Sequence, residues 1–154
     1  MKLIATSLAL FAASTLAAHA DSFTFTGTAQ ITSEVGGPVA GGKPVGAAFS
    51  SGGTSVKYAS GKTSTSKSQC ASWSATAGSA FTSQGICMAD EGASQFSVAF
   101  SCQAMDAAGA VSDCWGRLTG MTGTYANKTG MASWRGIRSA DKKSIVSTGT
   151  GSWN

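Results

Sequence analysis

Apolar and small polar residues alternate along several short stretches of this chain. In the clearest stretch, Phe96, Val98 and Phe100 are separated by single small residues. A period of two places every second side chain on one face, which is typical of a half-buried β-strand. Glycine and serine interrupt every stretch and strong helix formers are scarce, so no helical period is sustained. The pattern therefore predicts an all-β fold.

Clusters of turn-forming residues separate these stretches. They are Gly36-Gly37-Pro38, Gly41-Gly42-Lys43-Pro44, Ser51-Gly52-Gly53, Asp90-Glu91-Gly92, Ala107-Ala108-Gly109 and Ala126-Asn127-Lys128. Their spacing is typical of a β-sandwich or a β-barrel. We expect strands near residues 22–31, 45–49, 54–59, 69–76, 80–88, 94–104, 110–119, 130–137 and 144–153. Residues 33–67 are the least defined segment and are compatible with a long loop.

The first twenty residues predict a cleavable secretory signal. Lys2 supplies a positive charge, an apolar run extends to Leu16, and Ala18-His19-Ala20 has the small-x-small pattern of a cleavage site. The apolar run of about 14 residues is shorter than the roughly 20 that span a bilayer, so no membrane span is expected. We expect cleavage after Ala20, a single domain over residues 21–154, and a periplasmic or secreted location.

The expected mature domain has little apolar bulk for a core. Leu118 is its only leucine, and 28 of its residues are large and apolar or aromatic. Small exported domains offset a weak core with disulfides, and an even number of cysteines indicates such bridges. The cysteines are Cys70, Cys87, Cys102 and Cys114. They contain no Cys-x-x-Cys pair, and the only histidine lies in the expected signal, so a zinc site is not expected.

Hairpin symmetry favours the disulfides Cys70–Cys87 and Cys102–Cys114. The first pair is centred on Gly78-Ser79 and the second on Ala108, both in expected turns. Adjacent antiparallel strands would place the two members of each pair opposite each other, with Cα atoms about 5.5–6 Å apart. Four cysteines allow three connectivities, and the other two stay open.

Alternation also assigns side chains to faces. Cys102 shares the core face with Phe96, Val98 and Phe100, and the next strand would add Cys114, Gly116 and Leu118 to that face. Asp113, Trp115 and Arg117 would then face outward. The tryptophans, Trp73, Trp115, Trp134 and Trp153, are expected to plug the core or anchor strands, with a cavity wall or a sugar-stacking surface as alternatives. For a ligand in a barrel cavity, the candidate contacts are Trp73, Phe96, Phe100 and Trp134.

Several kinds of chemistry are excluded by residue type. Without a histidine after residue 20, the chain lacks a Ser-His-Asp triad, a Cys-His pair and histidine metal ligands. No cofactor or metal is expected, and no catalytic residue is identified. Glu34 and Asp113 are the carboxylates least explained by turns, and either could act as a lone acid.

The charge of the chain is mildly positive. The formal net charge of +4 is too small to favour nucleic acid as a partner. Basic residues gather late in the chain, at Arg117, Lys128, Arg135, Arg138, Lys142 and Lys143. They are either an ordinary solvated face or a basic face that is weakly attracted to an anionic surface.

The C-terminal half carries a pattern of glycine turns. It runs from Gly85-Ile86-Cys87 and the Asp90-Glu91-Gly92 turn, through Gly120-Met121-Thr122-Gly123-Thr124-Tyr125, to Gly130-Met131-Ala132-Ser133-Trp134. Over residues 85–153 this resembles bacterial proteins with an allene oxide cyclase-like barrel. The resemblance implies an eight-stranded, calycin-like antiparallel barrel. Plant cyclases of that fold hold a fatty-acid epoxide in an apolar cavity and form trimers, so a trimer is possible here by resemblance. None of their polar pocket residues maps onto this chain.

The sequence therefore predicts an exported β-barrel that binds a small apolar or amphipathic ligand. One alternative is a protein-binding module, such as a periplasmic inhibitor or surface interaction protein, with residues 33–67 and the basic C-terminal face as its contact surface. A weaker alternative is a cyclase or isomerase, which requires an inward polar cluster around the cavity.

Overall fold

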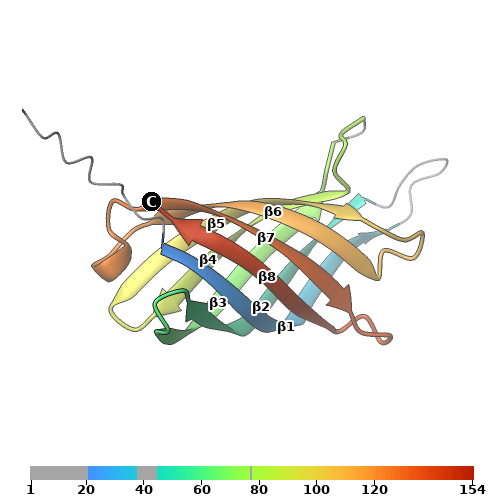
Figure 1. Cartoon of the computed structure of the whole chain (residues 1–154). Coiled ribbons are helices and arrows are strands. Elements are labelled where there is room, and N and C mark those ends of the chain that lie inside the picture. The colour runs from blue at the N-terminus through green and yellow to red at the C-terminus, as the bar shows by residue number, and fades with distance from the viewer. Residues whose placement is uncertain (1–20, 38–44, 77) are drawn as a thin grey trace, which may run out of the picture.

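The computed structural model describes residues 21–37, 45–76 and 78–154. Two predictions lie outside the described residues: the signal over residues 1–20 and the glycine turn at residues 41–44. The fold is a closed barrel of eight strands (Figure 1). The strands are β1 (Asp21–Gly37), β2 (Val45–Tyr58), β3 (Thr63–Ser74), β4 (Ser83–Glu91), β5 (Ser94–Ala104), β6 (Val111–Gly120), β7 (Thr129–Arg138) and β8 (Ser144–Trp153). A short 3-10 helix, η1 (Gly123–Tyr125), lies between β6 and β7.

Every strand pairs antiparallel with the next strand in the chain, and β8 pairs back onto β1 to close the ring. The closing register places Asp21 opposite Trp153 and Gln30 opposite Ser144. This confirms the predicted all-β fold and the eight-stranded antiparallel barrel. No helix within the described ranges is long and apolar enough to cross a membrane.

The expected strands at 45–49 and 54–59 are in fact one strand, β2. The turn predicted at Ser51-Gly52-Gly53 was wrong because Gly52 is needed where β2 passes close to β1. A Cβ at Gly52 would lie 2.1 Å from the carbonyl oxygen of Thr28. Glycine inside a strand marks such close backbone approaches as well as turns.

The described part of residues 33–67, the segment left as compatible with a long loop, is mostly strand. β1 continues to Gly37 through the glycines that predicted a turn, β2 covers Val45–Tyr58, and β3 begins at Thr63. The parts that escaped prediction are the end of β1 after residue 31 and the start of β3 before residue 69. Residues there are mostly polar or small, so the alternation of apolar and polar side chains is weak.

Three other predicted turns are confirmed by left-handed backbone conformations. Gly92 has φ 68°, Gly109 has φ 66° and Asn127 has φ 64°. Glycine and asparagine adopt these conformations more readily than other residues. They connect β4 to β5, β5 to β6, and η1 to β7.

Both favoured disulfides, Cys70–Cys87 and Cys102–Cys114, are present. Each joins directly opposite residues of adjacent strands. The Cα atoms lie 4.0 Å apart in both bridges. The predicted spacing of about 5.5–6 Å was wrong because directly opposed strand residues approach more closely than the average cystine.

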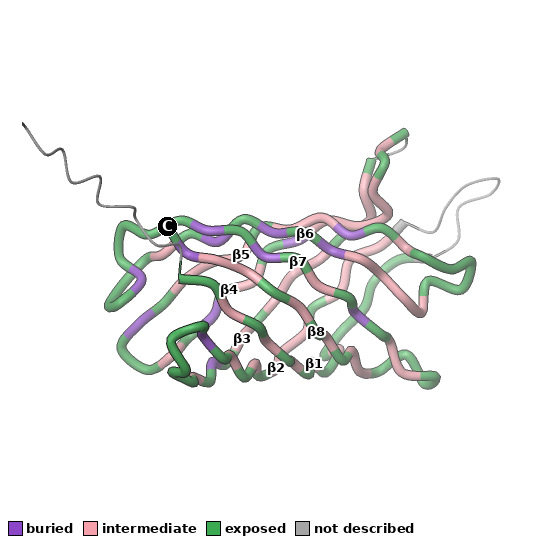
Figure 2. The backbone as a smooth tube through the Cα atoms, viewed as in Figure 1, coloured by how far each residue is buried: buried purple, intermediate pink, exposed green. Residues whose placement is uncertain are grey.

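The two faces of the wall follow the predicted alternation. Along β6, Cys114, Gly116 and Leu118 are buried, whereas Trp115 and Arg117 are exposed (Figure 2). Thr24, Thr26 and Thr28 occupy the outer face of β1. Threonine suits that position because it favours the β conformation and carries a hydroxyl toward water.

Candidate ligand-binding cavity

A cavity of about 170 Å³ lies inside the barrel. All eight strands contribute to its wall, and Tyr125 of η1 contributes from one end. Its wall includes Phe25, Ser66, Ser68, Phe96, Trp134 and Trp153. A barrel of eight strands has an interior wide enough for side chains or for one small ligand.

Aromatic rings cover part of the inner wall and pack over glycines. The rings of Phe25 and Trp134 meet edge to face with centroids 6.3 Å apart. A Cβ at Gly149 would lie 2.6 Å from the Cβ of Trp134 and 2.8 Å from the Cζ of Phe25. The glycine on β8 therefore makes the room that these two rings occupy.

The rings do not fill the interior. Among the described residues, no large side chain is fully buried. Small inward residues, Gly27, Ala29 and Ala89, line the cavity on β1 and β4. Because these side chains are short, they leave the space that the aromatic rings do not reach.

The inner face of β3 is a row of hydroxyls. Its inward positions are Ser64, Ser66, Ser68, Cys70, Ser72 and Ser74. Ser66 is buried, and Ser66 and Ser68 both line the cavity. The Oγ atom of Ser64 is buried without a hydrogen-bond partner among the described residues. In the closed ring, β3 lies four strands away from β7, the strand of Trp134, so the hydroxyl row faces an aromatic wall.

One end of the barrel is closed by η1, at the same end as the C-terminus (Figure 1). The ring of Tyr125 stacks on Trp153 with centroids 4.8 Å apart and contacts Phe96 edge to face at 4.9 Å. Ser94 holds the helix in place, because its Oγ atom accepts a 3.0 Å hydrogen bond from the backbone N–H of Thr124. These contacts hold Tyr125 in place over the end of the barrel.

Tyr125 is also the centre of a chain of hydrogen bonds. Its hydroxyl donates to Glu91 Oε2 at 2.5 Å, and its oxygen lies 2.8 Å from the hydroxyl oxygen of Tyr58. Burial first, and then these hydrogen bonds to Glu91 and Tyr58, raises the pKa of the Tyr125 phenol above its usual range. Tyr125 therefore keeps its proton at the closed end of the cavity.

The structure brings together only part of the predicted ligand set. Phe96 and Trp134 line the cavity. Phe100 points inward and packs against Trp134 with ring centroids 5.7 Å apart, but it is not part of the cavity wall. Trp73 lies on the outer face, 45% exposed, and does not belong to the cavity. Its position was foreseeable, since an odd spacing from the inward Cys70 places it on the opposite face.

Sequence reasoning missed the hydroxyls at the closed end and along β3. Tyr58, Tyr125, Ser66 and Ser68 all line the cavity. Residues 63–68 do carry a period of two, but threonine and lysine alternate there with serine. Since both faces are polar, the pattern gave no reason to place serine inside.

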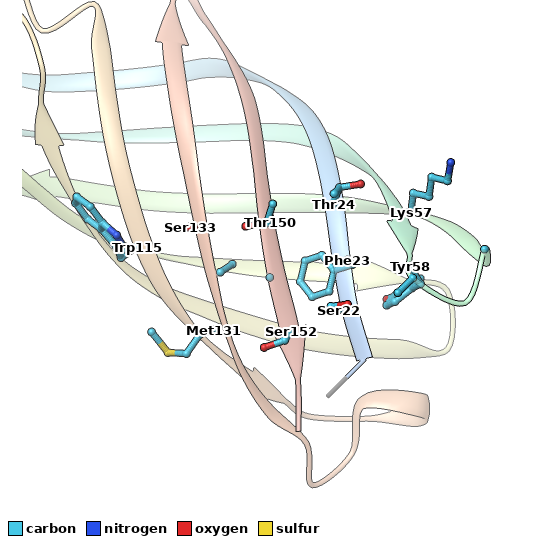
Figure 3. A pocket seen from close by; sticks show the side chains of 14 residues that line it. Ser22, Phe23, Thr24, Lys57, Tyr58, Trp115, Met131, Ser133, Thr150 and Ser152 are labelled. Atoms are coloured by element: carbon cyan, nitrogen blue, oxygen red, sulfur yellow. The ribbon is translucent and has the colours of Figure 1, made fainter. Parts of the chain in front are cut away.

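A wider hollow of about 830 Å³ lies on the outer wall near the same end (Figure 3). Ser133, Thr150, Thr24 and Lys57 follow one another across its floor in the register of β7, β8, β1 and β2. Thr24 points away from its inward neighbour Phe23 (Figure 3). Exposed Trp115 and Met131 border the hollow. This hollow is open to the outside of the barrel, whereas the cavity of about 170 Å³ lies in the barrel interior.

The two carboxylates considered as lone acids are in ion pairs. Asp113 Oδ1 lies 2.7 Å from Arg135 Nε, and Glu34 pairs with Arg138. The hydrogen bond from Arg135 holds the pKa of Asp113 below its usual range. These ion pairs also offset the charges of Arg135 and Arg138, two of the basic residues that gather late in the chain.

The described residues contain no group of three or more His, Cys, Asp or Glu side chains placed to hold a metal ion. Comparison of the chain with known family models, curated proteins and solved structures gave no match.

Proposed function

We propose that the protein binds one small apolar or amphipathic molecule in the interior of its barrel. The observation that carries this proposal is an unfilled cavity of about 170 Å³ between an aromatic wall and a row of small and hydroxyl side chains. A dry protein cavity of about 150 Å³ lined by apolar residues is large enough to hold benzene. The expected ligand is therefore about the size of a single substituted ring.

The chemistry of the wall supports this size class. Phe25, Phe96 and Trp134 offer flat apolar surfaces, and ligand sites are mainly apolar with a few polar groups. A long acyl chain would need more room than the cavity has. The resemblance to the allene oxide cyclase-like barrels is compatible with binding inside the barrel, and membership of that calycin-like family is part of the proposal.

Export is also part of the proposal. The predicted signal over residues 1–20 and the two disulfides support an extracytoplasmic location, since such bridges persist in oxidising compartments.

The test fills the cavity from β3. Ser68→Leu would place an isobutyl group in the cavity, whereas Gln69→Leu, its neighbour in the chain, would place the same group on the outer face. Toluene is titrated into each protein and followed by calorimetry and by tryptophan fluorescence. Binding to the unmodified protein and to Gln69→Leu, with loss in Ser68→Leu, is expected. Absence of toluene binding, or equal binding by both variants, would contradict an interior site.

The second candidate is a protein-binding role, and an apolar strip on the outer wall favours it. Phe49, Ala71, Ile86 and Ala99 lie side by side across β2 to β5, and Phe49 and Ile86 are exposed. Exposed apolar patches often mark interaction sites. If this strip binds a protein, Ile86→Ser should abolish recovery of a partner that the unmodified protein retains from a periplasmic extract, and Thr26→Ser should not.

A further inference from the structure

The direction of each proton in the Tyr58–Tyr125–Glu91 chain follows from the number of protons available. The Tyr125 hydroxyl donates to Glu91, whose carboxylate oxygens accept hydrogen bonds. A phenol carries a single proton, so Tyr125 has none left for Tyr58. The 2.8 Å contact between the two phenol oxygens is therefore a hydrogen bond from Tyr58 to Tyr125.

This order leaves the Tyr58 oxygen as an acceptor. Its own proton is used toward Tyr125, but its lone pairs have no donor among the described residues. Tyr58 is buried, and its side chain lines the cavity. A ligand that supplies a donor here would gain a hydrogen bond that an apolar ligand cannot make.

The serines of β3 add further hydroxyls to the wall of the same cavity. Ser66 and Ser68 line the cavity, and no hydrogen bond joins their hydroxyls to other described residues. A serine hydroxyl can accept as well as donate. The Tyr58 oxygen can accept a hydrogen bond from a ligand but has no proton left to donate. The two serine hydroxyls can either accept or donate, so Tyr58 is the group that favours a ligand with a donor.

We infer that the cavity selects a small ring compound that carries an O–H or N–H donor, with the donor directed at Tyr58 and the β3 serines and the ring against Trp134 and Phe96. This inference rests on the proposed function. It narrows the ligand class from apolar or amphipathic molecules to phenol-like or small N–H heteroaromatic ones.

The experiment compares phenol with toluene, which have nearly the same shape and differ in the donor. Dissociation constants for both are measured by calorimetry on the full mature protein at neutral pH. In the unmodified protein, phenol should bind at least as tightly as toluene, although its hydroxyl must lose bound water. Tyr58→Phe should raise the dissociation constant of phenol about tenfold and leave that of toluene unchanged.

A second variant guards against a folding defect in the first. Ser66→Ala removes a cavity hydroxyl and should likewise weaken the binding of phenol but not that of toluene. Ser72→Ala is the matched control, because Ser72 lies on the same inner face of β3 but outside the cavity wall. It should change neither constant.

The outcomes separate the two proposals. Two results would show that the donor inference is wrong while the proposed apolar site remains. One is that the unmodified protein binds toluene but binds phenol much more weakly. The other is that neither Tyr58→Phe nor Ser66→Ala changes the dissociation constant of phenol. If neither compound binds, the proposed function itself is wrong.

Discussion

The phenol oxygens of Tyr58 and Tyr125 lie 2.8 Å apart, although the residues are 67 positions apart in the chain. Tyr58 ends β2, and Tyr125 ends η1. Their contact joins the end of β2 to the connection between β6 and β7 at the closed end of the barrel. Glu91 of β4 accepts a hydrogen bond from the same Tyr125 hydroxyl and so ties a third element to this point.

Removing the Tyr125 hydroxyl should destabilise the barrel. Tyr125→Phe leaves Glu91 without its donor and Tyr58 without its acceptor, so the free energy of unfolding should fall by about 1–3 kcal/mol. Urea unfolding followed by tryptophan fluorescence measures the change. Thr150→Val removes an exposed hydroxyl from the outer wall and should change stability by less than about 0.5 kcal/mol. Equal effects of the two substitutions would show that the hydrogen-bond chain adds no stability.

The raised pKa of Tyr125 predicts a loss of stability at alkaline pH. In the unfolded chain a tyrosine phenol titrates near pH 10, whereas the folded protein holds the Tyr125 proton to higher pH. The contribution is therefore fully present below about pH 10 and is lost as pH rises above it, because ionisation then favours the unfolded chain. Unfolding free energies at several pH values from 8 to 11 should decline less steeply in Tyr125→Phe. Parallel curves would contradict the raised pKa.

Glycines beneath aromatic rings should not tolerate even a methyl group. A Cβ at Gly151 would lie 2.4 Å from Phe23 Cζ and 2.8 Å from the carbonyl oxygen of Met131. Gly151→Ala should therefore lower the unfolding free energy by about 1–3 kcal/mol through overpacking. At Gly53 the nearest atom to a Cβ is the carbonyl oxygen of Ser66 at 3.6 Å, an ordinary contact. Gly53→Ala should be neutral or stabilising by up to about 1 kcal/mol, and a comparable loss at both sites would argue against ring packing as the cause.

The two disulfides should contribute similarly to stability but differently to binding. Their sequence separations are 17 and 12 residues, so replacing either pair by alanines should cost about 3 kcal/mol in urea unfolding. Only Cys70 and Cys87 line the cavity. The Cys70→Ala, Cys87→Ala protein should therefore admit a larger ring such as naphthalene, while the Cys102→Ala, Cys114→Ala protein should not. Uptake of naphthalene by both would place the cavity elsewhere.

The sequence predicted the fold best where one face of a strand is apolar and the other is not. The Phe96–Phe100 stretch has that contrast, and its faces and the Cys102–Cys114 pairing follow from it. On β3 serine alternates with threonine and lysine, so the inner hydroxyls could not be told from outer ones. Gly52 was misread because a close approach between strands depends on residues of β1 that are distant in the chain.

The candidate site was harder to foresee than the wall around it. Phe96 and Trp134 could be chosen from their apolar character, but Tyr125 reaches the cavity only because η1 folds back over the end of the barrel. No periodicity reports a contact made by a connection between strands.

The pairing of β1 with β8 has a consequence for how the molecule is made. Phe23 faces Gly151, so the ring is completed by residues from the two ends of the domain. Contacts between such distant residues are slow to form because a long chain must first be closed. Until β8 arrives, β1 and β7 each present an unpaired edge on which another chain could add a strand. The complete barrel has no such edge, so the time between the appearance of the first strand and the arrival of the last is when the protein is most exposed to aggregation.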